Sequence, residues 1–284
     1  MKLYTDCIPC IISQTVKLSA DLGLKPDDQK KLLREVLLLS SEVSYDRSPP
    51  HIAKEVYRLI HKILKNPDPY RKVKEKYNQL ALKFYPSLKE EVKNSRDRFK
   101  KAVKLSIAGN VIDFGSNRKF SLEKTIKDAL RKRLSVDHTG SLKRSLIEAS
   151  KVLYLGDNAG ETVFDRILIE EFPEKQIYYG VRGSPVINDA TLKDALACGL
   201  DSVAHLISNG SDAPGTILED CSFEFKSVFD QSDLVIAKGQ GNYETLNEVG
   251  GKKIFFLFMV KCPVIAADAG CPVGGYVAME NESG

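Results

Sequence analysis

The spacing of apolar residues changes once along this chain, at Lys151. Before that residue, apolar side chains recur every three or four positions, as in PDDQKKLLREVLLLSSEV, and this spacing predicts helices. After it, short apolar runs such as KVLYL, DLVIA and KIFFLF alternate with helical stretches. This alternation predicts an α/β fold in which helices cover both faces of a mostly parallel sheet.

Three parts are expected from this change of spacing. Residues 1–105 form an all-helical domain, residues 106–150 form a helical connection that packs on the sheet domain, and residues 151–284 form the α/β/α domain. The last helix expected before the sheet is SLEKTIKDALRKRLS, residues 121–135, with Ser121 as its N-cap.

The net charge of +4 conceals two halves of opposite sign. Residues 1–150 hold 32 Lys and Arg against 18 Asp and Glu, whereas residues 151–284 hold 10 against 20. A basic half could bind nucleic acid. Its charges are interleaved with acids along helical patterns, however, so we expect a solvated surface and no nucleic-acid partner. No apolar run suits a membrane span or a signal peptide, so we expect a cytoplasmic protein without a membrane partner.

Nearly every predicted strand ends in small, polar or cationic residues. These ends are Asp157-Asn158, Arg182-Gly183, Ser208-Asn209-Gly210, Lys238-Gly239-Gln240-Gly241-Asn242 and Lys261-Cys262-Pro263. An open parallel sheet binds ligands beyond the carboxyl ends of its strands. One polar end is an ordinary turn, whereas five in succession predict a binding site.

Three oxygen-bearing residues suit a hard cation. Asp157 and Asn158 follow the first strand, and Asp189 opens the next helix. Their oxygens favour Mg²⁺, Mn²⁺ or a similar ion, and the four His lie outside these loops, which disfavours a zinc site built from histidines. Taken singly, Asp189 is most simply a helix cap and Asp157-Asn158 a turn.

Cationic and glycine-rich strand ends add the features of a phosphate site. Arg182, Lys238 and Lys261 supply positive charge, and KGQGNYE places a turn before a helix whose N–H groups could hold an anion. The residues expected to contact substrate or phosphate are Glu161, Arg182, Asn209, Lys238, Gly239, Gly241, Asn242 and Lys261. The Gly-Gln-Gly run alone is a weak signal, because it is neither a dinucleotide fingerprint nor a P-loop.

Two further pairs are candidates for the site. Asn110 and Asp113, in the nearly uncharged segment SIAGNVIDFGSN, lie one helical turn apart. They either fasten the helices onto the sheet or reach the site. Cys7 and Cys10 form a Cys-x-x-Cys without a second such pair, and they are either ordinary thiols or a redox or metal pair.

Several motifs, in order along the chain, resemble those of the damage-control phosphatases. They are GDNAGETVFD, GSPVINDAT, ISNGSDAPG, DLVIAKGQGNYETL and KCPVIA, together with AGNVIDFG and the N-terminal CIPC that marks one branch of the family. The resemblance spans essentially the whole chain. It implies a metal-dependent phosphatase of phosphorylated metabolites, with an N-terminal helical domain and a three-layer α/β/α domain.

The same resemblance assigns roles to individual residues. It implies Asp157, Asn158 and Asp189 as metal ligands and Lys261 as the phosphate-contacting lysine. The run FMVKCP lacks the Arg-Thr pair that another branch carries shortly before this lysine. The substrates of that branch are therefore not implied.

We therefore expect a metal-dependent phosphoric monoester hydrolase acting on sugar phosphates or damaged phosphometabolites. The divalent metal expected first is Mn²⁺, with Ni²⁺, Co²⁺ or Mg²⁺ as alternatives, and it would lower the pKa of the attacking water. Asp157 or Asp189 would orient or deprotonate that water, and Lys261, with Arg182 or Lys238, would stabilise charge on the phosphoryl oxygens. We prefer in-line attack by water without a phosphoenzyme.

Two alternatives stay open. A carboxyl methyltransferase that uses S-adenosylmethionine would need a glycine-rich first loop followed by an acid at the next strand end, and no convincing one is present. A non-enzymatic RNA-binding protein would need exposed aromatic residues among its cations, and the Tyr and Phe here have the pattern of core residues. The sequence does not specify an oligomeric state.

The double substitution Cys7→Ser and Cys10→Ser should leave the rate of hydrolysis within roughly an order of magnitude of the parent. The chemistry outlined above requires neither thiol. Steady-state kinetics on the folded double variant checks this, and complete loss of activity would show that CIPC belongs to the site.

Overall fold

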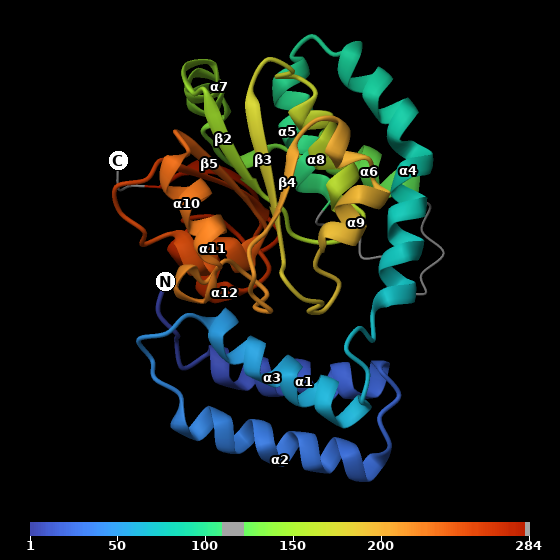
Figure 1. Ribbon diagram of the computed structural model, residues 1–284, viewed down its shortest axis with the longest axis vertical. Coiled ribbons are helices and arrows are strands. Elements are labelled where there is room, and N and C mark those ends of the chain that lie inside the picture. Colours follow the sequence, from blue (N-terminus) through green and yellow to red (C-terminus); the bar gives the residue numbers. More distant parts are fainter. Residues whose placement is uncertain (110–121, 282–284) are drawn as a thin grey trace.

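Helices make up the N-terminal part of the chain, as the apolar spacing predicts. The structure is a computed structural model that describes residues 1–109 and 122–281 (Figure 1). The helices before the first strand are α1 (Cys7–Asp21), α2 (Pro26–Glu42), α3 (Pro49–Leu64), α4 (Arg71–Lys93), α5 (Arg98–Gly109) and α6 (Leu122–Arg131). Pro26 and Pro49 open α2 and α3, positions at which the missing N–H of proline leaves no helical hydrogen bond unmade. Asn110 and Asp113 lie outside the described residues, so their role stays a prediction.

A seven-stranded sheet forms the centre of the molecule. Its strands are β1 (Leu134–Asp137), β2 (Lys151–Leu155), β3 (Gln176–Val181), β4 (His205–Ser208), β5 (Leu234–Lys238), β6 (Ile254–Met259) and β7 (Tyr276–Glu280). The strand order is β1-β7-β6-β5-β2-β3-β4, and β6–β7 is the antiparallel pair among parallel neighbours. The mostly parallel sheet of an α/β fold is therefore confirmed.

The β1 edge of the sheet corrects the predicted helical connection. The helix expected over residues 121–135 ends at Arg131, and β1 follows within the segment that was predicted to be helical. β1 pairs with β7, which was also not predicted. A strand of four residues, LSVD, is too short to show a period of two, so the helical pattern before it dominates the prediction.

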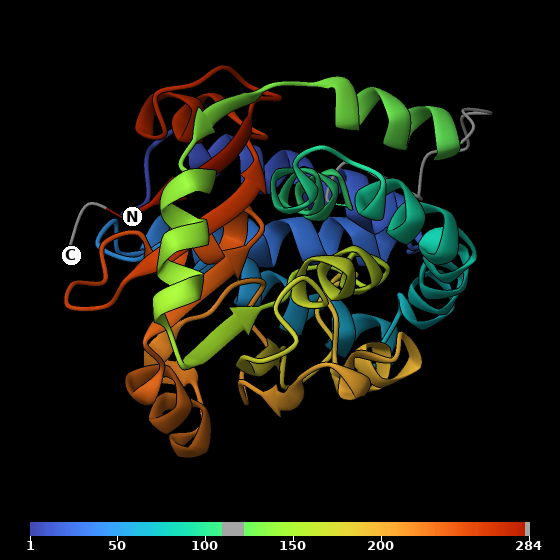
Figure 2. The ribbon, with the colours of Figure 1, turned by 90° about the horizontal axis from the view of Figure 1, so that it is seen from above.

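Two apolar layers enclose the sheet. Val152 and Tyr154 of β2 belong to the layer beneath α4, α5, α7 (Thr139–Glu148), α8 (Glu161–Ile169) and α9 (Leu192–Ala197). Leu153 and Leu155 belong to the opposite layer, beneath α10 (Phe223–Gln231), α11 (Gln240–Leu246) and α12 (Pro263–Asp268). Figure 2 shows α4, α5 and α8 gathered on one side of the sheet. Because successive strand side chains point to opposite faces, the helices on both faces follow from the strand sequences themselves.

Helices α1, α2 and α3 have an apolar core of their own. This core contains Leu32, Val36, Ile52 and Ile60. Leu88 of α4 belongs instead to the apolar layer that also contains Val152 and Tyr154 of β2. The boundary between the two cores therefore lies between α3 and α4. It comes earlier in the chain than the boundary predicted at residue 105, because α4 packs along α8. Figure 1 shows the three helices lying across one end of the sheet.

Charged side chains join these helices to the loops beyond β4. Lys54 of α3 donates to Asp220 at 2.5 Å, and Arg58 donates to both carboxylate oxygens of Asp212, at 2.6 and 2.9 Å. His51 lies 3.0 Å from a carboxylate oxygen of Glu219. The contact between α3 and the loops beyond β4, called the seam below, is thus largely ionic. Within the described ranges, no helix is long and apolar enough to cross a membrane.

Candidate active site

The direction of strand addition reverses between β2 and β5. From β2 the chain adds β3 and β4 on one side, and it then returns to add β5 and β6 on the other. A crevice forms at such a switch point, beyond the carboxyl ends of the two strands. Asp157 follows β2 and Gly239 follows β5, and the two are in close contact. A Cβ atom at Gly239 would lie 2.1 Å from Asp157 Oδ2, and its φ of 81° is one that side chains rarely tolerate.

Backbone pairing brings the predicted metal ligands together. Asn158 and Asp189 form an isolated antiparallel bridge. The N–H of Ala190 donates to Asp157 O at 2.8 Å, and the N–H of Ala159 donates to Asn188 O at 2.8 Å. Backbone hydrogen bonds therefore hold the loop after β2 and the loop after β3 side by side. The structure brings Asp157, Asn158 and Asp189 to one place, and metal binding itself stays a prediction.

The guanidinium of Arg182 lies between the two aspartates. Its Nε donates to Asp189 Oδ2 at 2.7 Å, and its Nη2 lies 3.7 Å from Asp157 Oδ1. Asn242 accepts from Arg182 Nη1 at 3.2 Å and donates to the carbonyl oxygen of Lys238 at 2.8 Å. Asn242 is fully buried and holds the arginine in place. Its expected contact with substrate stays a prediction.

Asn158 is oriented by two carboxylates. Its Nδ2 donates to Asp157 Oδ2 at 3.0 Å and to Glu161 Oε1 at 2.6 Å. The other polar atom of this amide, Oδ1, is then the one that could ligate a cation. Glu161 was expected to contact phosphate, but a carboxylate repels that group. The structure places Glu161 where it orients Asn158.

Lys238 is buried beneath the site instead of facing it. The ammonium donates to three acceptors, namely Ser106 O at 2.8 Å, Asp165 Oδ1 at 2.8 Å and Glu161 Oε2 at 3.3 Å. Burial acts to lower the pKa of Lys238, but the carboxylates of Asp165 and Glu161 outweigh it and raise that pKa above its ordinary value. All three N–H bonds of the ammonium are occupied by protein. Its expected phosphate contact stays a prediction that this placement does not support.

Asp165 collects the donors around Lys238. It accepts from Ser106 Oγ, from the Tyr154 hydroxyl and from the Tyr179 hydroxyl, each at 2.8 Å. Burial, and then the negative charge of Asp165, raise the pKa of both phenols well above the ordinary value. Both tyrosines are therefore held as neutral donors. This network links α5 and α8 to the ends of β2, β3 and β5.

The buried charges at this end of the sheet do not balance among the described residues. The carboxylates are Asp157, Glu161, Asp165 and Asp189, and the cations are Arg182 and Lys238, none of them more than 8% exposed. With all four carboxyls ionised, the surplus of two negative charges equals the charge of one divalent cation. Burial raises the pKa of Asp189 and of Glu161 to about 7, and Arg182 and Lys238, respectively, oppose these rises only in part. Such an uncompensated buried charge is costly unless a further positive group is bound.

The donor set fits a hard cation. It consists of two carboxylates and one amide, as oxygen-preferring ions require. Within residues 1–109 and 122–281, no three Cys, His, Asp or Glu side chains form a metal-binding group. A metal site at this place would therefore need a ligand of another kind, such as the amide oxygen of Asn158.

Two buried donors near the crevice lack hydrogen-bond acceptors among the described residues. They are Arg182 Nη2 and Asn209 Nδ2. The Asn209 amide is fixed, because its Oδ1 accepts the N–H groups of Gly183 and Ser211 at 2.9 Å each. An anion bound in the crevice could accept from both donors. This placement suits the phosphate contacts expected for Arg182 and Asn209.

The glycine-rich turn and Lys261 form the rim of the crevice. The N–H of Gly239 donates to Leu257 O at 3.1 Å, so this amide is not part of an anion nest, and the expected role of Gly241 stays a prediction. Lys261 is exposed, and Gln240 Oε1 accepts its backbone N–H at 2.9 Å. The positive charge of Lys261 acts on the Asp189 carboxyl, so the two lie within electrostatic range.

The sequence did not point to two residues that the helices supply. Tyr57 of α3 lies close enough that the charge of Asp189 adds to burial in raising the pKa of its phenol. Asn78 of α4 accepts the N–H of Gly160 at 2.7 Å and donates to Asp194 at 3.0 Å, which holds the turn after Asn158. Neither has a local signal, because helical spacing marks a buried face without saying what it covers.

The Cys-x-x-Cys lies at the start of α1, near the rim. Burial raises the pKa of Cys7 and of Cys10, and Cys262 is near enough to add to both shifts. All three thiols are free. Thiols with a raised pKa are poor nucleophiles, so ordinary thiols explain this pair better than a reactive one.

Comparison with known proteins gives a family and a set of relatives. Residues 3–277 match the family described as "Damage-control phosphatase ARMT1-like domain". An uncharacterised protein of Methanocaldococcus jannaschii is 38% identical, over 99% of this chain and 96% of its own length. A protein of Archaeoglobus fulgidus named damage-control phosphatase is 35% identical, over 98% of this chain and 99% of its own.

A solved structure resembles the whole chain. It is the crystal structure of a DUF89 family protein from Pyrococcus horikoshii, which is 34% identical and superposes with a TM-score of 0.91. The match covers 99% of this chain and 100% of that one. The protein from that organism is also named a damage-control phosphatase.

Removal of either partner of the Lys238–Asp165 pair should destabilise the protein strongly. Lys238→Met or Asp165→Asn should each lower the free energy of unfolding by about 3–5 kcal/mol, because the other charge is left buried without its partner. The double variant should lose less than the sum of the two single losses. Urea denaturation measures each value.

A matched control is the exposed pair of Lys193 and Glu75, whose charged atoms lie 2.9 Å apart. Lys193→Met should cost about 0–1 kcal/mol. A loss in Lys238→Met as small as that in the control would contradict the central role given to the buried pair.

Proposed function

Because the chain belongs to the damage-control phosphatase family with an ARMT1-like domain, we propose that it is a metal-dependent phosphoric monoester hydrolase. Family membership makes it a phosphatase of metabolite repair. The need for a divalent metal, the substrates and the site residues belong to our proposal. The proposed substrates are small phosphorylated metabolites, such as sugar phosphates or damaged phosphometabolites.

One observation carries the proposal, namely the surplus of two negative charges buried at the switch point of the sheet. Asp157, Asn158 and Asp189 would hold the cation there. When bound, a divalent cation such as Mn²⁺ would screen the charge of a phosphate and lower the pKa of a water. Mn²⁺ is proposed first, with Ni²⁺, Co²⁺ and Mg²⁺ as alternatives, because the ligand atoms are all oxygens.

The protein groups around the cation supply the remaining steps. Arg182 Nη2 and Asn209 Nδ2 would donate to phosphoryl oxygens, since both lack other acceptors among the described residues. Lys261 would reach in from the rim and stabilise charge that develops in the transition state. Asp157 or Asp189 would orient or deprotonate the attacking water. Water would attack in line without a phosphoenzyme, because the carboxylates are committed to the metal and to Arg182.

The family membership favours hydrolysis over the two alternatives. A carboxyl methyltransferase would need a glycine-rich loop after its first strand, whereas here β2 is followed by Asp157 and Asn158. An RNA-binding protein would need exposed aromatic residues among the cations. The large buried side chains include Tyr154, Tyr179 and Tyr276, so these aromatics serve the core.

Phosphatase activity should require an added divalent metal and should disappear in chelator. The reason is the oxygen ligand set, which binds such ions reversibly. A hydrolysis screen over phosphorylated metabolites, run with and without each cation, measures this. Full activity after exhaustive chelation, with no metal found by elemental analysis, would rule out the metal hypothesis.

Substitution of Asp157 and substitution of Lys261 should impair the enzyme in different ways. Asp157→Ala should abolish turnover and weaken metal binding, because it removes a charged ligand. Lys261→Ala should bind metal nearly as the parent does and should slow turnover by roughly 10²- to 10³-fold, as loss of one oxyanion donor does. Lys261→Arg should rescue only partly, because a planar guanidinium does not replace a compact ammonium.

Lys253→Ala is the matched control, since this exposed lysine precedes β6 and Lys261 follows it. It should leave the rate unchanged. Calorimetric metal titration and steady-state kinetics on each folded variant test the pair. Normal metal binding by Asp157→Ala, or normal turnover by Lys261→Ala, would show that the site is misplaced.

A further inference from the structure

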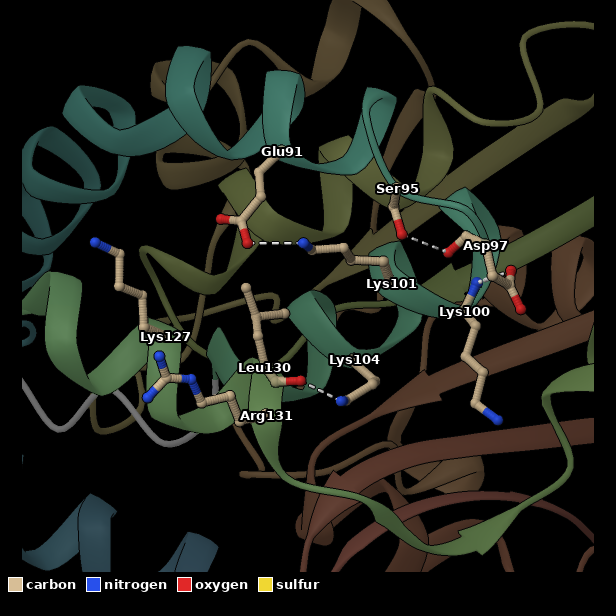
Figure 3. A pocket seen from close by; sticks show the side chains of 9 residues that line it. All are labelled: Glu91, Ser95, Asp97, Lys100, Lys101, Lys104, Lys127, Leu130 and Arg131. Carbon is tan, nitrogen blue, oxygen red and sulfur yellow. Dashed lines mark hydrogen bonds and ion pairs between the residues drawn. The ribbon is translucent and has the colours of Figure 1, made fainter.

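A basic hollow lies away from the candidate active site, where α4, α5 and α6 meet. It has a volume of about 500 Å³ (Figure 3). The cations that line it are Lys100, Lys101 and Lys104 of α5 and Lys127 and Arg131 of α6, against the two carboxylates of Glu91 and Asp97. Figure 3 shows Lys127 and Arg131 of α6 on one side of the hollow and Lys100 and Lys101 of α5 on the other, with the ammonium of Lys104 beside Leu130 of α6. The proposed phosphatase reaction uses none of these side chains.

The lysines of α5 are crowded at an electrostatic cost. Lys104 is half-buried, and its ammonium donates to the carbonyl oxygen of Leu130. Burial lowers the pKa of Lys104, and the like charges of Lys100 and Lys101 lower it further. The nearby charges therefore make it harder for this lysine to stay protonated.

Ion pairs engage several of these cations. Lys101 lies 2.7 Å from Glu91, and Lys100 lies 2.5 Å from Asp137. The acceptor of Lys104 is a neutral carbonyl. Arg131 lies 3.9 Å from Asp128. The lining itself nevertheless holds five cations against two carboxylates, so the potential inside the hollow favours an anion.

A second hollow of about 750 Å³ continues the basic surface. It shares Ser95, Asp97 and Lys100 with the first and adds the cations Arg96, Arg98 and Lys143. The cations of the two hollows thus lie on both sides of Lys100 of α5. A single orthophosphate would contact only a few of these groups, whereas a longer anion would contact more of them at once.

The first hollow has the size of a small-molecule site, and its lining contains no aromatic side chain on which a nucleobase could stack. Leu130 is its apolar lining residue. Recognition would therefore rest on charge and not on a base. We propose that this hollow binds small anions with two or more linked phosphate groups, such as a polyphosphate or the phosphate chain of a nucleotide.

The test is calorimetric titration of the full chain with tripolyphosphate, without added divalent metal, because linked phosphates bind metal themselves. The double variant Lys127→Gln and Arg131→Gln should weaken binding by about tenfold or more, and the parent affinity should fall as salt is raised. Both side chains are exposed, so the variant should fold. Lys104→Met, which removes a cation supplied by α5, should weaken binding by a similar factor.

The matched control is Lys17→Gln with Lys31→Gln, which removes two exposed lysines from α1 and α2. Its affinity should stay within about twofold of the parent, since the same net charge is lost far from the hollow. Adenosine triphosphate should bind about as tightly as tripolyphosphate, because no base contact is expected. Phosphatase turnover of all three variants should match the parent, so failure of this proposal is distinct from failure of the proposed reaction.

Three results would overturn the proposal. Unchanged tripolyphosphate affinity in both hollow variants would place binding elsewhere. Orthophosphate binding as tight as that of tripolyphosphate would remove the requirement for linked phosphates. Tighter binding of an oligouridine, lost in the Lys127 and Arg131 variant, would show a nucleic-acid surface instead.

Discussion

The buried ammonium of Lys238 is the contact on which this end of the molecule depends. It binds the carbonyl oxygen of Ser106 on α5 and the carboxylates of Glu161 and Asp165 on α8, while its own backbone ends β5. Three elements are thereby held at fixed positions around the switch point. Glu161 in turn orients Asn158. A charge with no access to solvent thus determines the geometry of residues that do face the crevice.

The same buried charges motivate the cation that we propose at the site. Lys238 forms ion pairs with Glu161 and Asp165. Arg182 lies beside two aspartates, 2.7 Å from Asp189 and 3.7 Å from Asp157. One guanidinium cannot neutralise both in a medium of low polarity. This imbalance is the physical ground for the cation that we propose at this site.

The sequence predicted where the site lies better than it predicted how each side chain points. KVLYL and DLVIA are apolar at every position after the first, so the strands and the polar residues after them could be located. Lys238 was assigned to phosphate because it ends a strand, but the period of two places it on the same face as Ile236, beneath α5 and α8. Tyr57 and Asn78 could not be found, because their partners lie far away in the chain: 116 residues separate Asn78 from Asp194. Strands β1 and β7, neighbours at one side of the sheet, lacked enough length or apolar contrast to be recognised.

The ionic seam between α3 and the loops beyond β4 bears on how the protein responds to salt. The core of α1, α2 and α3 is separate from the cores of the sheet, and the contacts across the seam include Lys54 with Asp220 and Arg58 with Asp212. Dissolved ions weaken contacts of this kind, whereas they weaken apolar packing far less. The hold of α3 on the loops beyond β4 should therefore loosen as ionic strength rises, while the packing within each core should not.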